Sequence, residues 1–133
     1  RPGSSFTLAS YSSQVKLWNK DLQAANRKNK DSAVQFVERL VAKGNTCTLE
    51  GLKRAFDTVN ADTIVLLSDG APTGTKKNGE RWTEDEILAE TSGINKVKQW
   101  RIHTFGFGAA GQALVKFMKD LAENNDGKFT KID

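Results

Sequence analysis

The alternation of apolar and polar residues predicts a pair of antiparallel strands at the start of the chain. Side chains alternate in character through Ser5–Tyr11 and again through Val15–Trp18, as in strands with one buried face. The short polar segment Ser12–Gln14 between them predicts a tight turn. The stretch Asn19–Lys30 is largely polar and basic, which predicts a surface loop.

Two helices are predicted after this loop. Ser32 and Gln35 fit a capping box, Ser-x-x-Gln, at the start of the first helix. Its apolar residues recur at helical spacing and define one face: Ala33, Phe36, Val37, Leu40 and Val41. Gly44 is expected to stop this helix in the left-handed conformation. The second helix is expected to begin near Thr48, its N-cap, and to bury Leu49, Leu52, Ala55, Phe56 and Val59.

The stretch Thr63–Leu67 contains only β-branched residues and leucine, without polar alternation. That pattern predicts a strand buried on both faces, as in a parallel sheet covered by helices. The strand runs directly into Ser68 and Asp69. Because ligands of open α/β sheets bind at the carboxyl ends of the strands, Asp69 is the first candidate for a functional residue.

The remaining pattern alternates between helix and strand. Gly70–Arg81 is a predicted loop, and Thr83–Glu86 is a capping box that starts a helix reaching about to Gln99. This helix is expected to pack Ile87, Leu88, Ile94 and Val97 and to be weakened at Gly93. A strand over Ile102–Phe107, a helix over Leu114–Ala122 and a last strand over Lys128–Ile132 follow. The resulting β-α-β-α-β order predicts parallel strands with right-handed crossovers.

Composition narrows the class of protein. The chain has 133 residues, of which 38% are hydrophobic and 27% charged, as expected for one globular domain without a membrane span. Its net charge of +4 is not concentrated, and the clusters at Arg27–Lys30 and Lys76–Arg81 are expected to be solvated loops, so nucleic-acid binding is not predicted. The single cysteine, Cys47, excludes an internal disulfide, and it does not indicate the cellular compartment of the protein.

Several side chains are candidates for chemistry. Asp69 can coordinate a hard cation such as Mg²⁺, although an aspartate before Gly70 is also common in turns. Thr46 lies in the loop ahead of a helix that Thr48 can cap, so its hydroxyl is available for another role. The only histidine, His103, lies inside a predicted strand, which favours a core or edge position. No nucleophile–base pair is visible, so an enzyme is not expected.

Gly106–Gly111 matches the dinucleotide-binding pattern G-x-G-x-x-G, follows a strand and opens a helix. Asp133 stands about where the ribose-binding acid of such a motif is found. Against this hypothesis, the β-α-β unit is the last in the chain, and the pattern arises readily among 11 glycines. A nucleotide-binding α/β domain is therefore kept as an alternative.

Taken together, four segments resemble the von Willebrand factor type A domain family: Gly44–Thr46, Ile64–Thr73, Ile102–Gly108 and Leu121–Phe129. Phe6–Trp18 is similar to that family's second and third strands. The resemblance covers nearly the whole chain in the right order, as one domain over residues 1–133. It implies a three-layer, Rossmann-like α/β sandwich, with a mostly parallel sheet and one antiparallel edge strand.

The resemblance also implies a metal-ion-dependent adhesion site. In the family, three segments hold the cation: Asp-x-Ser-x-Ser, a threonine before a helix, and an aspartate after the fourth strand. Thr46 matches the threonine and Asp69 matches the aspartate, whereas the Asp-x-Ser-x-Ser segment is absent from this sequence. Ser68, Gly70 and Thr73 are expected to line the ligand-binding surface. Mg²⁺ or another divalent cation would bind weakly through so few ligands and accept an acidic side chain of a protein partner.

By the same resemblance, Arg1 corresponds to a position just after the family's first helix. The family's first strand and first helix are therefore expected to be missing from this chain. A complementary N-terminal segment, a second copy of the chain, or direct pairing of the second and fourth strands would close the gap. The expected function is that of an adhesion-type protein-binding module. The alternatives are a structural fragment completed by another chain and the nucleotide-binding domain at Gly106–Gly111.

Overall fold

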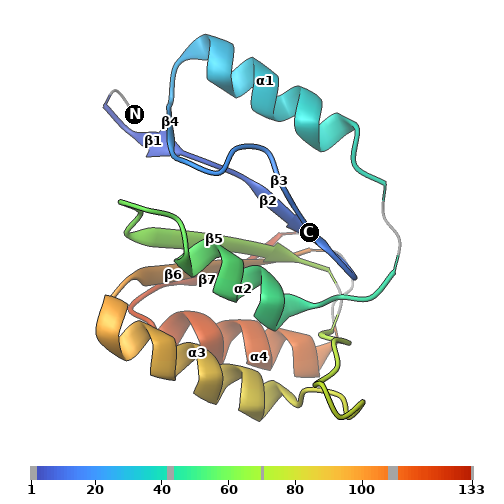
Figure 1. Ribbon diagram of the computed structural model, residues 1–133. Coiled ribbons are helices and arrows are strands. Elements are labelled where there is room, and N and C mark those ends of the chain that lie inside the picture. Colours follow the sequence, from blue (N-terminus) through green and yellow to red (C-terminus); the bar gives the residue numbers. More distant parts are fainter. Residues whose placement is uncertain (1–2, 42–43, 70, 108–110, 133) are drawn as a thin grey trace. The chain divides into compact units, whose positions relative to one another are not determined.

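The computed structural model of the chain describes residues 3–41, 44–69, 71–107 and 111–132 (Figure 1). The chain divides into two compact units, Arg1–Ala61 and Asp62–Asp133, and each is described by itself. Among the described residues, no helix is both long and apolar enough to cross a membrane.

The first unit begins with two antiparallel strand pairs. The predicted hairpin is confirmed for β2 (Ala9–Tyr11) and β3 (Val15–Leu17), with Tyr11 opposite Val15. The predicted strand over 5–11 is divided, because β1 (Ser5–Phe6) pairs instead with β4 (Gln23–Ala24). The break falls at Thr7, whose hydroxyl donates a hydrogen bond of 2.6 Å to the Asn19 carbonyl. The segment predicted to be a loop therefore contains β4.

Helix α1 (Arg27–Glu38) begins earlier than its predicted cap. Asn26 is the cap residue, and its side chain accepts the Asn29 backbone N–H at 2.8 Å. The Ser32 hydroxyl instead accepts a hydrogen bond of 3.1 Å from the Trp18 indole Nε1. The predicted capping box was wrong, because Asn26 offers an equally good cap six residues earlier in the chain.

The predicted apolar face of α1 was also wrong. Only Ala33 of that face is buried, and Leu40 and Val41 lie beyond the C-cap Arg39. Gly44 is left-handed, with φ of 82°, but it does not end the helix. Because burial of an amphipathic face provides most helical stability, little favours extending α1 past Glu38.

Helix α2 (Thr48–Phe56) forms where it was predicted. Leu49, Leu52 and Phe56 are buried as expected, whereas Val59 lies past the helix and is exposed. The N-cap position is Cys47, which makes no side-chain cap bond, so Thr48 is a buried helical residue and not the cap.

The second unit confirms the β-α-β-α-β order. Strands β5 (Thr63–Ser68), β6 (Arg101–Phe107) and β7 (Phe129–Ile132) form a parallel three-stranded sheet in that order. The crossover helices α3 (Glu84–Lys98) and α4 (Gln112–Glu123) lie on the same face of this sheet (Figure 1). That placement is the one expected when both crossovers are right-handed, as is usual, and advance in one direction. The α/β class is confirmed, and the third layer of the sandwich stays a prediction.

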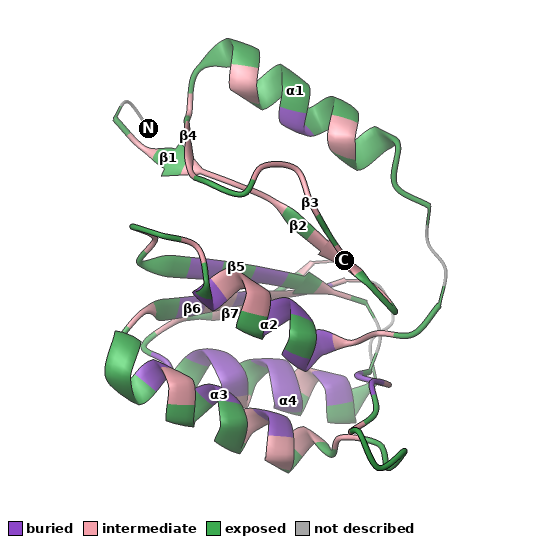
Figure 2. Ribbon diagram, viewed as in Figure 1, coloured by how far each residue is buried: buried purple, intermediate pink, exposed green. Residues whose placement is uncertain are grey.

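The core of the second unit lies between this sheet and its helices. Its buried apolar residues are Ile64, Leu66, Ile87, Ile102, Leu114, Phe117, Met118, Leu121 and Ala122. Strand β5 alternates, with Val65 and Leu67 each 52% exposed, so the prediction of burial on both faces was wrong (Figure 2). Within this unit both crossover helices cover one face of the sheet, and Val65 and Leu67 lie on the other face.

Helix α3 confirms its predicted start. Thr83 accepts the Glu86 backbone N–H at 3.1 Å, and the Glu86 carboxylate accepts the Thr83 backbone N–H at 3.0 Å. The helix continues unbroken through Gly93. Its buried face is Ile87, Thr91 and Asn95, and Val97 is 87% exposed instead of packed. The prediction from apolar spacing did not include Thr91 and Asn95, the two polar residues that face the core.

Candidate functional site

Asp69 lies at the carboxyl edge of the sheet in the second unit. Ser68 is the last residue of β5, half-buried and opposite Gly106 of β6. Asp69 follows it directly and is exposed. Because the strands are parallel, their carboxyl ends lie at one edge, so the predicted strand end carries an accessible carboxylate. Gly70 lies outside the described residues.

The segment after Asp69 folds into a compact turn. The Trp82 N–H donates to the Gly74 carbonyl at 3.0 Å, and the Lys76 N–H donates to the Glu80 carbonyl at 2.7 Å. Thr75 and Arg81 form an isolated antiparallel bridge between these bonds. The predicted ligand-binding residue Thr73 is half-buried where this turn begins. The segment predicted as a loop is therefore held by its own backbone hydrogen bonds.

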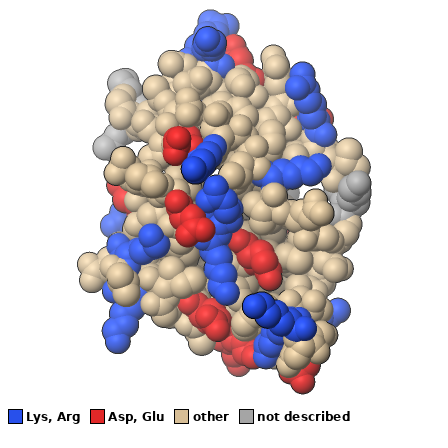
Figure 3. Space-filling model, viewed as in Figure 1, with Lys and Arg blue, Asp and Glu red and all other residues tan. Residues whose placement is uncertain are grey.

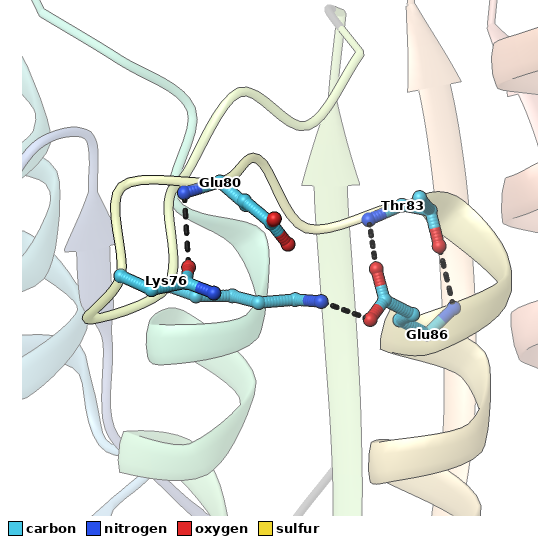
Figure 4. A network of polar contacts seen from close by, with 5 residues as sticks. Lys76, Glu80, Thr83 and Glu86 are labelled. Carbon is cyan, nitrogen blue, oxygen red and sulfur yellow. Dashed lines mark hydrogen bonds and ion pairs between the residues drawn. The ribbon is translucent and has the colours of Figure 1, made fainter.

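Lys76 ties this turn to the start of α3 (Figure 4). Its ammonium forms an ion pair with the Glu86 carboxylate and lies 5.2 Å from the centroid of the Trp82 ring. The hydrogen bond from Lys76, followed by that from the Thr83 backbone, lowers the pKa of Glu86 to about 2. Lys76 was predicted to be solvated, but its side chain is only 25% exposed. No local sequence pattern signals the pair, because a turn separates its members.

Thr46 lies in the first unit, in the loop ahead of α2. The β2–β3 turn holds this loop, because the Asn45 N–H donates to the Ser13 hydroxyl at 2.9 Å and the Cys47 N–H to the Ser12 carbonyl at 3.1 Å. Thr46 itself is half-buried, and its carbonyl accepts the Thr48 N–H at 3.0 Å. Thr46 and Asp69 belong to different units, so their meeting at one cation stays a prediction.

The backbone of Gly44 explains why glycine opens this loop. Its φ is 82°, and an added Cβ would lie 2.4 Å from the Ser13 Oγ. Both the left-handed conformation and the contact exclude a larger residue without rearrangement. The Ser13 contact had no signal in the sequence.

The chemistry of the predicted donors suits a hard cation only in part. Carboxylate and hydroxyl oxygens are the ligands that Mg²⁺ prefers, and it retains several waters. Among the residues described, no group of three or more His, Cys, Asp or Glu side chains could hold a metal ion. Partial burial, followed by the charge of Glu50, raises the pKa of the Cys47 thiol, which disfavours the thiolate. The described donors therefore fit a weakly bound cation that keeps most of its water ligands.

Two other candidates have structural explanations. Gly106 lies inside β6, and an added Cβ would be 3.2 Å from Cε1 of the Phe129 ring. It does not begin the tight turn that a dinucleotide fingerprint requires of its first glycine. Residues 108–110 and Asp133 of that hypothesis lie outside the described residues. The His103 Nδ1 accepts the Lys128 backbone N–H at 3.1 Å and so holds β6 to the start of β7.

Charge is distributed in the manner expected from the sequence. On the face drawn in Figure 3, basic and acidic side chains lie interspersed and do not form a single basic patch. The described residues on that face therefore form no continuous basic surface for a phosphate backbone.

Comparison with known proteins finds one family and several relatives. Residues 1–130 match the profile of a family described as the von Willebrand factor type A domain. The chain is 26% identical to human von Willebrand factor A domain-containing protein 3A over 125 residues, which cover 94% of the chain and 10% of that protein.

Two further relatives are of similar distance. Human von Willebrand factor A domain-containing protein 3B is 26% identical over 129 residues, or 95% of the chain and 9% of that protein. The pig inter-alpha-trypsin inhibitor heavy chain H2 is 23% identical in an alignment 139 residues long, which covers 96% of the chain and 14% of that protein. The chain thus spans a small fraction of the length of each relative.

Proposed function

The chain belongs to the von Willebrand factor type A domain family, and we propose that it binds a protein ligand at the carboxyl edge of β5. The observation that carries this proposal is the exposed carboxylate of Asp69 directly after a strand whose alternate residues, Ile64 and Leu66, are buried. A rigid strand fixes the position of the carboxylate. The turn that is held by Lys76 and Glu86 follows Asp69 in the sequence. Such an edge is where open α/β sheets bind their ligands.

A divalent cation would complete the recognition. Asp69 would supply an oxygen ligand, and Ser68 and Thr73 would contact the ligand beside it. With so few protein ligands, most of the coordination shell of Mg²⁺ would be water. An acidic side chain of the partner is the expected exchangeable ligand, and we expect weak affinity for the metal by itself.

Calorimetric titration with Mg²⁺ and Mn²⁺ tests the cation. Asp69→Ala should abolish the binding heat, whereas Asp57→Ala, which removes another exposed carboxylate at the end of α2, should retain it. Equal heats for both variants would exclude Asp69 as a ligand. If neither metal binds at millimolar concentration, protein binding at this edge does not use a cation.

A structural role is the second candidate. Strand β5 forms one end of the described three-stranded sheet, and its Val65 and Leu67 are half exposed on one face. Packing of a second copy against this face would cover these side chains without metal. Native mass spectrometry distinguishes the two states, because a dimer that Val65→Lys dissociates supports this role and a monomer of 14.6 kDa contradicts it.

A further inference from the structure

We propose that the outer face of α3 is a docking groove for a basic helix of a protein partner. A groove of about 530 Å³ runs along this face, lined by Trp82, Glu86, Ala89, Glu90, Gly93 and Ile94. All of these residues belong to the second unit, and none of them is among the buried residues of α3, Ile87, Thr91 and Asn95. We call it the α3 groove.

Gly93 has no structural reason to be glycine. It lies within α3, where glycine is less stable than alanine, and its φ is not left-handed. Apart from its chain neighbours and the backbone of its own helix, an added Cβ would meet no described heavy atom within 4 Å. A side chain at this position would instead enter the α3 groove. The helix therefore loses stability at a position where a larger residue would fill the groove.

The surroundings of Gly93 favour a helix as the occupant. Ala89 lies one turn before it, and small side chains at the contact allow the axes of two packed helices to lie closer together. Ile94 and the 87% exposed Val97 offer apolar contact along the same side. Trp82 stands at the amino end of the groove and adds aromatic surface. The groove thus provides a line of contact parallel to the axis of α3.

One carboxylate of the groove, that of Glu90, favours a basic partner, because the charge of Glu86 is already balanced by Lys76. Glu86 and Glu90 lie one turn apart on the groove wall. Lys76 and Thr83 hold the Glu86 carboxylate in place, whereas no ion pair among the described residues includes Glu90. An arginine or lysine of a partner helix could therefore pair with Glu90. Exposed pairs contribute little affinity, so the apolar contacts would provide the binding and the charges the choice of partner.

An NMR titration of the isotope-labelled chain tests the proposal. The probe is an alanine-based helical peptide of about 18 residues, with two arginines one turn apart and a leucine between them on the same face. We expect amide shifts confined to the stretch between Trp82 and Val97. Gly93→Leu should weaken binding about tenfold by filling the groove, and Glu90→Lys about threefold to tenfold by repelling the arginines.

Matched variants serve as controls. Ser92→Leu adds the same side chain at the neighbouring exposed position, which does not line the groove, and should leave affinity unchanged. Glu123→Lys reverses an exposed charge on α4 and should do likewise. Both leucine variants replace weaker helix formers, so melting temperatures at or above wild type confirm folding. Asp69→Ala should not affect this binding, which separates the groove from the cation site.

Three results would overturn the proposal. One is equal affinity of Gly93→Leu and Ser92→Leu for the peptide. Another is an equal response of the same amides to a peptide with glutamates in place of the arginines. The third is the absence of any shift at millimolar peptide. Glu90→Lys changes an exposed side chain only, so it keeps the test valid even if Gly93→Leu misfolds.

Discussion

The side-chain amide of Asn95 donates a hydrogen bond of 2.9 Å to the side-chain oxygen of Asn125. Asn95 also donates to the Trp100 carbonyl at 2.7 Å and accepts the Trp100 N–H at 2.6 Å. Asn125 donates to the Leu121 carbonyl at 2.7 Å, and its own carbonyl accepts the Ile102 N–H at 3.1 Å. This buried network joins the ends of α3 and α4 to the start of β6, opposite the edge that carries Asp69.

Asn95→Ala is expected to destabilise the fold by about 2–4 kcal/mol, because it leaves several buried polar groups without partners. Chemical denaturation monitored by circular dichroism measures the change. Lys96→Ala, at the next and exposed position of α3, is the control and should shift stability by less than about 0.5 kcal/mol. Similar losses for both variants would show that the network contributes nothing particular.

Gly127→Ala should disrupt the second unit. An added Cβ would lie 1.6 Å from the Ile102 carbonyl oxygen, a contact that only movement of the backbone can relieve. We expect a loss above about 3 kcal/mol, as for other severe steric conflicts in a core. Gly93→Ala is the matched substitution in open space and should stabilise α3 by about 0.5–1 kcal/mol. Thermal unfolding of the two variants should therefore shift in opposite directions.

Glu86 should make stability depend on acid. Its pKa is lowered from 4.5 to about 2 in the folded chain. A group with a lowered folded pKa stabilises the fold above its unfolded pKa, and this contribution is lost as the pH falls through the folded value. The contribution of Glu86 should therefore be complete above pH 4.5 and disappear toward pH 2.

Lys76→Met tests the origin of that shift. An NMR titration of the Glu86 carboxyl carbon should give a pKa near 2 in the wild type and a value closer to 4.5 in the variant. Lys77→Met, which alters the exposed neighbour, should leave the Glu86 titration unchanged. If Lys76→Met also leaves it unchanged, the ion pair is not the principal cause.

Gly44→Ala should displace the loop that carries Thr46. The left-handed conformation by itself should cost about 1–2 kcal/mol for a residue with a Cβ, and the contact with Ser13 adds to it. Ser13→Gly removes the contacting side chain and should recover part of the loss in the double variant. Denaturation of the single and double variants measures this coupling, and strictly additive losses would argue against the contact.

Much of the candidate site was predictable from local pattern. An apolar run that ends in Ser68 and Asp69 is a strand delivering a carboxylate to the sheet edge, and β5 places it there. The start of α3 was equally predictable, because the capping box of Thr83 and Glu86 lies within one helical turn. The ion pair of Lys76 was not predictable, since it depends on how the intervening turn folds back on α3.

The sequence by itself determined the order of strands and helices in the second unit and the family, because periodicity and capping are local properties of the chain. Tertiary structure alone decided which faces are buried. Thr91 and Asn95 point inward, Val65 and Val97 are exposed, and Gly127 lies against the Ile102 carbonyl. Burial depends on which element packs from elsewhere in the chain, and no local pattern contains that information.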